Sequence, residues 1–137
     1  MAKVNMTVDL DVGADELWKL IGGFNALPDW HPAVEKSELE DEGSMRKLSL
    51  VGGGSIVEKL VKKSDNERLY SYTIEDSPLP VANYTSTIRV TDNGKGKSQV
   101  EWSSEFNPKG VGDNDAVQVI QGIYQAGFDN LKKMFGG

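Results

Sequence analysis

The sequence contains no cysteine and only one histidine among its 137 residues. Without cysteine the chain can form no disulfide and can offer no thiolate nucleophile. One histidine falls short of the set of histidine and cysteine ligands that the usual zinc site needs. We therefore expect neither a metal ion nor a cofactor.

Positive charge and long apolar runs are scarce as well. The net charge is −6 and the basic residues are scattered along the chain, which argues against a nucleic-acid partner and against a basic helix on a membrane surface. No segment has the apolar length of a membrane-spanning helix or the pattern of a signal peptide. We expect a soluble, cytoplasmic protein without membrane insertion, whose residues 1–137 form one domain.

The longest periodic segment runs from Asp113 to Phe135. Its apolar residues recur at steps of three, four and seven, which is typical of an amphipathic helix with a broad apolar face. The face comprises Val117, Ile120, Tyr124, Leu131 and Phe135, widened by Val119, Ile123, Phe128 and Met134. Gly122 and Gly127 lie inside this helix at a cost of about 1 kcal/mol each relative to alanine. We therefore expect close packing, or room for a bound molecule, beside them.

The rest of the chain predicts a sheet that this helix can cover. Residues 3–11 alternate as a half-buried strand, residues 14–21 have the spacing of a short helix, and a second short helical turn follows near Asn25, limited by Pro28 and Pro32. Six more strands are expected at residues 34–41, 46–50, 55–63, 68–75, 84–90 and 100–106, with a hairpin signal at Asp92-Asn93-Gly94. This order predicts an α+β domain, in which an antiparallel meander packs its apolar face on the C-terminal helix.

Several aromatic residues with polar tips fall on the inward faces of these strands. They are Tyr70, Tyr72, Tyr84 and Trp102, and Ser86 and Ser104 share their faces. In a dry core each buried hydroxyl or indole N–H needs a hydrogen-bond partner. Binding pockets, in contrast, combine apolar walls with a few polar groups. The pattern favours a cavity over a filled core.

Four stretches of the sequence resemble one family. Residues 23–34 (GFNALPDWHPAV), 68–72 (RLYSY), 78–84 (PLPVANY) and 100–103 (VEWS) resemble polyketide cyclase/dehydrase-like proteins of the Bet v 1 and START-related (SRPBCC) superfamily. The resemblance covers essentially the whole chain. It implies a helix-grip fold, in which a curved seven-stranded antiparallel sheet surrounds a long C-terminal helix.

Shorter stretches resemble the plant abscisic-acid receptors, which are more distant members of the superfamily. Glu58-Lys59-Leu60 resembles their Glu-Arg-Leu strand, whose Glu helps to hold the polar end of the ligand. Residues 83–86 (NYTS) resemble their Asn-Tyr-Lys-Ser, whose Tyr and Ser line the pocket. The lysine that pairs with the hormone carboxylate has no evident counterpart, and Trp30 lies near its place. The resemblance implies shared pocket positions, not the same ligand.

Two features stay open on the residues alone. Strand 55–63 places Ile56, Glu58 and Leu60 on one face and Val57, Lys59 and Val61 on the other. Either orientation turns a charge inward, and only the resemblance selects Glu58 for the pocket. Gly52-Gly53-Gly54 fits an ordinary hairpin turn, or a mobile gate loop like that of the receptors.

The Trp30-His31-Pro32 segment also has two interpretations. It can place an aromatic residue and a titratable ring at the pocket mouth, with His31 as acid or base. It can also be a turn in which Trp30 packs on the core and His31 caps a neighbour. The candidate catalytic residues are His31 and Glu58. The predicted ligand-binding residues are Trp30, His31, Leu48, Leu50, Glu58, Tyr70, Tyr72, Tyr84, Ser86, Trp102, Ser104, Ile120 and Tyr124.

Three functions fit these patterns. The first is binding of a small hydrophobic or amphipathic ligand, such as a lipid, polyketide or isoprenoid-like molecule, between the sheet and the C-terminal helix. The second is a cyclase or dehydratase that acts on a polyketide-like substrate with acid/base residues of the same pocket. The third is a protein-interaction module like the helix-grip proteins that act on chaperones, which requires an exposed apolar patch.

Overall fold

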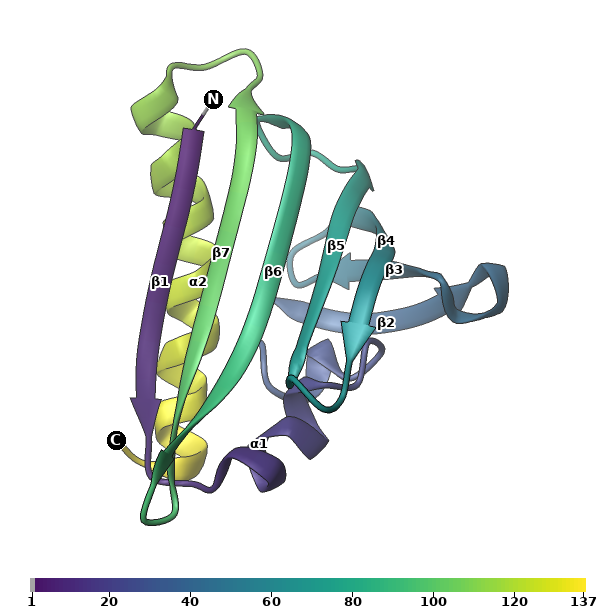
Figure 1. The fold of residues 1–137 in the computed structure, drawn as a ribbon. Helices are drawn as coiled ribbons and strands as arrows, with labels where there is room; N and C mark the ends of the chain where they lie inside the picture. The colour runs from purple at the N-terminus through teal and green to yellow at the C-terminus, as the bar shows by residue number, and fades with distance from the viewer. Residues whose placement is uncertain (1) are drawn as a thin grey trace.

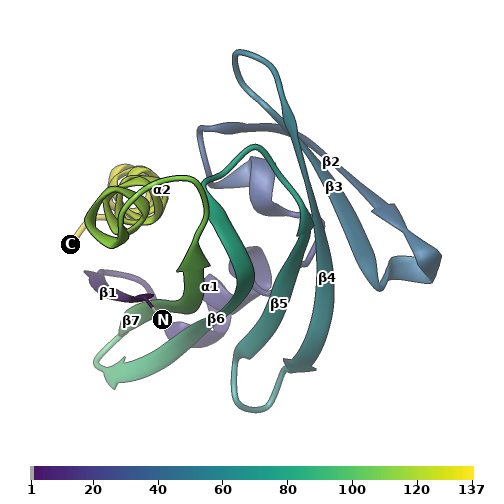
Figure 2. The same ribbon diagram turned by 90° about the horizontal axis from the view of Figure 1, so that it is seen from above.

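A curved antiparallel sheet holds a long helix against its concave face in the computed structural model, which describes residues 2–137 (Figure 1, Figure 2). Within that range the strands are β1 (Ala2–Leu10), β2 (Val34–Glu40), β3 (Met45–Leu50), β4 (Ser55–Ser64), β5 (Leu69–Asp76), β6 (Val81–Gly94) and β7 (Lys97–Pro108). The helices are α1 (Ala14–Ile21) and α2 (Asp113–Phe135), with short 3₁₀ turns η1 (Leu27–Asp29) and η2 (Asp41–Gly43).

The strands lie side by side in the order β1-β7-β6-β5-β4-β3-β2, and each is antiparallel to its neighbours. Strands β2 to β7 therefore form the predicted meander, and β1 pairs with the last strand. Strand β2, whose sequence is rich in charged residues, is an edge strand of the sheet. This arrangement confirms the predicted α+β helix-grip fold.

The helical segment between α1 and β2 is the second short helical turn that the sequence predicts near Asn25. It is the single 3₁₀ turn η1, with Pro28 near its start. Proline is tolerated in the first turn of a helix because its missing N–H has no intrahelical acceptor there. Pro32 follows closely and cannot donate the hydrogen bond that would extend the turn.

The buried face of α2 is narrower than the periodicity predicts. Its buried residues are Ala116, Ile120, Tyr124, Gly127, Phe128 and Leu131. Val119 and Met134, which the pattern places on the same face, are 39% and 45% exposed. The helix contacts β1 and β7, and Figure 2 shows β2, β3 and β4 curving away from it. The sheet therefore covers only part of the apolar face.

The β6–β7 hairpin turns two residues later than the Asn93-Gly94 signal predicts. Gly94 pairs with Lys97, and the turn residues are Lys95 and Gly96, with φ angles of 55° and 73°. Two positive φ angles are the requirement of the type I′ turn that joins twisted strands. Asp92 instead accepts the backbone N–H of Gly94 at 2.7 Å within an irregularity of β6.

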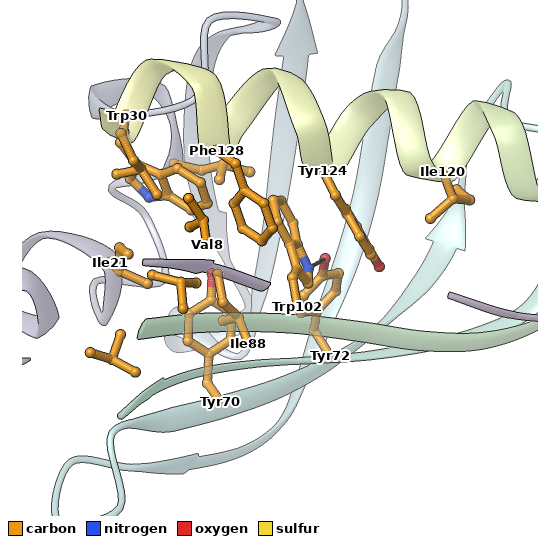
Figure 3. Packing of buried hydrophobic residues seen from close by; sticks show 14 of the residues in the cluster. Val8, Ile21, Trp30, Tyr70, Tyr72, Ile88, Trp102, Ile120, Tyr124 and Phe128 are labelled. Atoms are coloured by element: carbon orange, nitrogen blue, oxygen red, sulfur yellow. Dashed lines mark hydrogen bonds between the residues drawn. The ribbon is translucent and has the colours of Figure 1, made fainter. Parts of the chain in front are cut away.

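Aromatic rings fill the space where the sheet lies closest to α2 (Figure 3). Trp102 of β7 stacks on Tyr124 of α2 with ring centroids 4.1 Å apart. Trp30 is 1% exposed and packs against Trp102, with ring centroids 5.5 Å apart. These contacts fix the position of α2 over one side of the sheet. No helix within residues 2–137 combines the length and the hydropathy that crossing a membrane requires.

Candidate functional site

A cavity of about 270 Å³ lies between α2 and the part of the sheet formed by β3, β4 and β5. The segment after η1 and the loop before β6 complete its wall. Most of the wall is apolar, with a few polar side chains among the apolar ones. The lining residues are Leu27, His31, Ala33, Val34, Leu48, Leu50, Val51, Gly53, Ile56, Glu58, Tyr72, Ile74, Leu79, Tyr84, Trp102, Val119, Ile120, Ile123 and Tyr124.

Larger hollows exist elsewhere but have a different character. One of about 540 Å³ lies at the ends of β5 and β6, and one of about 430 Å³ lies near Arg68 and Arg89. Both are lined mainly by polar and charged side chains. Ligand pockets are predominantly apolar with few polar groups, so the smaller cavity under α2 is the candidate site.

The cavity reaches the surface between the β3–β4 hairpin and α2. Val51 in the hairpin is 63% exposed and Val119 on α2 is 39% exposed, and both line the cavity. Gly52, Gly53 and Gly54 have φ angles of 89°, 106° and 94°, a backbone region that strongly favours glycine. The three glycines thus form a hairpin turn at the mouth, and the gate-loop interpretation stays a prediction.

A buried ion pair stands behind one wall of the cavity. Arg46 of β3 is fully buried, Glu58 of β4 is 5% exposed, and the two residues are direct cross-strand neighbours. Nε and Nη2 of Arg46 lie 2.8 and 2.6 Å from Oε1 of Glu58. The guanidinium also donates to the carbonyl oxygen of Phe24 and lies 4.2 Å from the centroid of the Phe24 ring. These contacts hold both side chains in one orientation.

Glu58 points into the cavity while Lys59 on the same strand is exposed. Burial raises the pKa of the Glu58 carboxyl, and the charge and hydrogen bond of Arg46 oppose that rise. The guanidinium of Arg46 stays protonated at every pH at which proteins remain folded. The pair therefore presents to the cavity one carboxyl group whose positive partner lies behind it.

His31 is buried and joins the turn after η1 to α2. Its Nε2 donates to the carbonyl oxygen of Ile123 at 2.7 Å, and its Nδ1 accepts the backbone N–H of Ala33 at 3.2 Å. Burial lowers the pKa of His31, and the bond to Ile123 partly opposes this. Both ring nitrogens of the neutral imidazole thus have partners within the protein.

Hydroxyl groups on and behind the cavity wall form a chain of hydrogen bonds. Tyr124 lies within hydrogen-bond distance of Tyr84 and, at 3.0 Å, of Ser86. Ser86 donates to the carbonyl oxygen of Ser103 at 2.9 Å. The indole N–H of Trp102 lies 3.1 Å from both Ser86 Oγ and Tyr72 Oη. The chain satisfies most of the buried polar tips of this wall.

Burial also keeps these phenols protonated. It raises the pKa of Tyr124 to about 12 and those of Tyr72 and Tyr84 well above their ordinary value. At neutral pH the three side chains are hydrogen-bonding groups rather than phenolates. No group of three histidine, cysteine, aspartate or glutamate side chains within residues 2–137 is arranged to hold a metal ion.

The structure brings most of the predicted ligand-binding residues to this cavity. Those on its wall are His31, Leu48, Leu50, Glu58, Tyr72, Tyr84, Trp102, Ile120 and Tyr124. Four others are buried elsewhere and are not lining residues: Trp30, Tyr70, Ser86 and Ser104. Trp30 and Tyr70 pack into the aromatic core, and Ser86 lies behind Trp102 and Tyr124, which it orients by hydrogen bonds.

Sequence reasoning missed the residues at the rim. The β3–β4 hairpin contributes Val51, beside the glycines of the predicted gate loop, and the loop before β6 contributes Leu79. Loop residues follow no periodic pattern, so no local signal marks them. Ile123 and Val119 are predicted on the apolar face of α2 but not in the pocket, although Ile123 lies three residues from the predicted pocket residue Ile120 and four from Val119, a spacing that groups them on one side of the helix.

Comparison with known proteins places the chain in a family. The family described as "Polyketide cyclase / dehydrase and lipid transport" matches residues 1–136, and the chain belongs to it, as the resemblance predicts. No curated protein matches the chain.

Three solved structures illustrate the range of similarity. The protein XoxI from Bacillus cereus is 40% identical, with a TM-score of 0.96 over 98% of this chain and 96% of that one. An uncharacterized protein from Bacillus thuringiensis is 39% identical, with a TM-score of 0.95 over 97% and 98% of the two chains. The Zhui aromatase/cyclase from Streptomyces sp. R1128 is 16% identical, with a TM-score of 0.76 over 94% and 90%. That last similarity establishes a shared fold alone.

Proposed function

We propose that this protein, a member of the polyketide cyclase/dehydrase and lipid transport family, binds a small, largely apolar ligand in the cavity under α2. The ligand is of the lipid, polyketide or isoprenoid-like class, and residues 1–137 act as one binding domain. The observation that carries the proposal is the 270 Å³ cavity with its mostly apolar wall.

The chemistry of the wall supports binding more than catalysis by His31. A general base needs a free nitrogen within hydrogen-bond reach of the substrate. Both nitrogens of His31 are engaged, by Ile123 and Ala33. The tyrosines hold their protons because burial raises their pKa values. The wall therefore offers fixed hydrogen-bonding groups rather than a poised proton acceptor at His31.

One observation favours an enzyme as the second candidate. Glu58 is a carboxyl on the cavity wall whose pKa is raised by burial, and a carboxyl within reach of a bound substrate is a candidate general acid or base. A cyclase or dehydratase that uses Glu58 would lose its turnover in the Glu58→Gln variant while still binding substrate. A binding protein has no turnover to lose.

A hydrophobic fluorescent probe tests the binding proposal. We expect the native protein to bind it with a stoichiometry of one, and the Trp102→Ala variant, which removes part of the wall, to change its affinity. Binding that appears only under partly unfolding conditions would show that the native cavity accepts no guest. Mass spectrometry of an organic extract of the purified protein would then identify any ligand that copurifies.

A matched pair of valine substitutions localises the bound probe. Val119 lines the cavity mouth and is 39% exposed, whereas Val61 on β4 is 60% exposed and is not a lining residue. We expect Val119→Trp to weaken probe binding by obstructing the mouth and Val61→Trp to leave it unchanged. Equal effects of the two variants would place the probe outside the cavity.

A further inference from the structure

Two groups on the cavity wall keep hydrogen-bonding capacity that no described residue uses. The close contacts between Glu58 and Arg46 both end on Oε1 of the carboxylate. Within residues 2–137 no hydrogen bond reaches the other oxygen, Oε2. Glu58 therefore offers a free acceptor on the cavity wall.

Tyr72 offers a free donor. Its hydroxyl oxygen accepts the indole N–H of Trp102 at 3.1 Å, the bond drawn in Figure 3. Its own proton has no acceptor among the described residues. A phenol hydroxyl can accept one hydrogen bond and donate another at the same time, so the donor function of this buried hydroxyl is unused.

The neighbouring phenols have no such spare proton. Ser86 donates its proton to the carbonyl oxygen of Ser103, so its contact with Tyr124 must use the proton of Tyr124. The contact between Tyr84 and Tyr124 then uses the proton of Tyr84. Among the described residues, Tyr72 is therefore the phenol on the cavity wall whose hydroxyl proton can still be donated in a hydrogen bond.

The free donor and the free acceptor face the same space. Glu58 of β4 pairs with Ile74 of β5, and Tyr72 lies two residues from Ile74 on the same face of that strand. Such diagonal neighbours lie within reach of one small polar group. Both residues line the cavity.

The cavity wall offers no permanent cation to an anionic ligand: His31 is the one basic side chain among the lining residues, and burial lowers its pKa. No lysine or arginine is among the lining residues, and Arg46 lies behind Glu58 and is held by it. A ligand carboxylate in this position would meet the Glu58 carboxylate without a compensating cation, which is costly in a buried site.

We propose, on the basis of the binding function above, that Tyr72 and Glu58 form a subsite for a hydroxyl group of the ligand. The hydroxyl accepts the proton of Tyr72 and donates its own proton to Oε2 of Glu58. The ligand class is therefore an apolar alcohol or phenol, and free carboxylic acids are excluded by repulsion from Glu58.

Naphthol, naphthalene and naphthoic acid test this subsite because they share one apolar frame and differ in the polar group. Isothermal titration calorimetry at neutral pH measures each compound, and displacement of the hydrophobic probe shows that it enters the cavity. We expect naphthol to bind roughly ten- to hundredfold more tightly than naphthalene, the range for a hydrogen bond to a charged group. Naphthoate should bind most weakly.

Three variants assign the preference to residues. Tyr72→Phe keeps the ring and leaves Trp102 with Ser86 as acceptor, so we expect it to weaken naphthol binding roughly two- to tenfold and to leave naphthalene unchanged. Glu58→Gln should weaken naphthol binding and strengthen naphthoate binding, because it frees the charge of Arg46. Lys59→Gln, exposed on the opposite face of β4, is the control and should change none of the affinities.

The outcomes separate the subsite from the binding function. If naphthol and naphthalene bind equally to the native protein and Tyr72→Phe changes neither, the hydroxyl subsite is wrong while cavity binding stands. If none of the compounds displaces the probe, both proposals are wrong. The Tyr72→Phe comparison decides the question even if Glu58→Gln fails to fold with its unpaired Arg46.

Discussion

The imidazole Nε2 of His31 donates to the carbonyl oxygen of Ile123 at 2.7 Å and so ties the turn after η1 to the middle of α2. The side-chain amide of Asn130 adds a second tie, donating to the carbonyl oxygen of Trp30 at 2.8 Å. The close approach requires a glycine between them: a Cβ at Gly127 would lie 2.9 Å from His31 and 3.0 Å from Trp30. His31 and Ile123 both line the cavity, so this contact joins two parts of its wall.

The two glycines of α2 should respond oppositely to alanine. Gly127→Ala would push a methyl group into two buried rings, and we expect it to lower the free energy of unfolding by about 1–3 kcal/mol. At Gly122 nothing lies within 4 Å of the added Cβ, so Gly122→Ala should raise stability by up to about 1 kcal/mol through helix propensity. Urea unfolding midpoints measure both. Stabilisation by Gly127→Ala would contradict the packing argument.

Stability should fall in mild acid because of His31. Burial lowers the pKa of this histidine below its usual 6.5, so between that lowered value and 6.5 the unfolded chain binds more protons than the folded one. By linkage the free energy of unfolding then decreases as the pH falls through this window.

The His31→Gln variant isolates that contribution. Glutamine can still donate to Ile123 but does not titrate, so we expect the variant to lose less stability than the native protein between about pH 7 and pH 5. As the chain has one histidine, its imidazole NMR signals report the pKa directly. Parallel pH–stability curves, or an imidazole pKa at or above 6.5, would contradict the prediction.

Breaking the buried ion pair should be far costlier than breaking a surface pair. Arg46→Met leaves the Glu58 carboxylate buried without its cation, and we expect a loss of about 3–5 kcal/mol of unfolding free energy. Adding Glu58→Gln should recover part of that loss, because the uncompensated charge disappears. Denaturant unfolding of the single and double variants measures the coupling.

Lys36 and Glu38 provide the comparison for that measurement. Their charged groups lie 2.7 Å apart on the exposed edge strand, where solvent screens the interaction. Lys36→Gln should leave stability nearly unchanged. If Arg46→Met lowers the free energy of unfolding no more than Lys36→Gln does, the buried pair contributes no more to stability than the surface pair.

Metal removal should have no effect on folding or binding. The prediction is based on the single histidine and the absence of cysteine, which leave too few ligands for a usual zinc site. Elemental analysis of untagged protein should find no stoichiometric transition metal, and chelation should leave the thermal midpoint and probe binding unchanged. A chelator-induced drop in either quantity would overturn it.

Local patterns were sufficient to predict the elements and their order. The bounds of α1 and α2 follow from the spacing of apolar residues, because that spacing reflects helix geometry and needs no tertiary contact. One exception is the β6–β7 turn, where the local signal is Asn93-Gly94 but the turn residues are Lys95 and Gly96. The pairing of Gly94 with Lys97 selects the later turn, and the register of two long strands lies beyond any local window.

The partner of Glu58 required the tertiary structure. On the sequence, either face of strand 55–63 turned a charge inward, and no local pattern identified a cation that could pair with an inward Glu58. The register of β3 and β4 places Arg46 directly opposite Glu58, and the resulting ion pair makes the inward carboxylate tolerable. A buried charge is tolerable only where an opposite charge lies beside it, and here that partner comes from the neighbouring strand.

Tyr70 and Tyr72 show most clearly what each level decides. Both lie on the inward face of β5, and the sequence by itself determined this, because side chains alternate along a strand. Tyr70 packs edge-on against Phe24 in the core, whereas Tyr72 lines the cavity. Only the tertiary structure decided between these environments, because the difference depends on where the curved sheet diverges from α2. An inward-facing side chain meets packed neighbours where the two are close and open space where they separate.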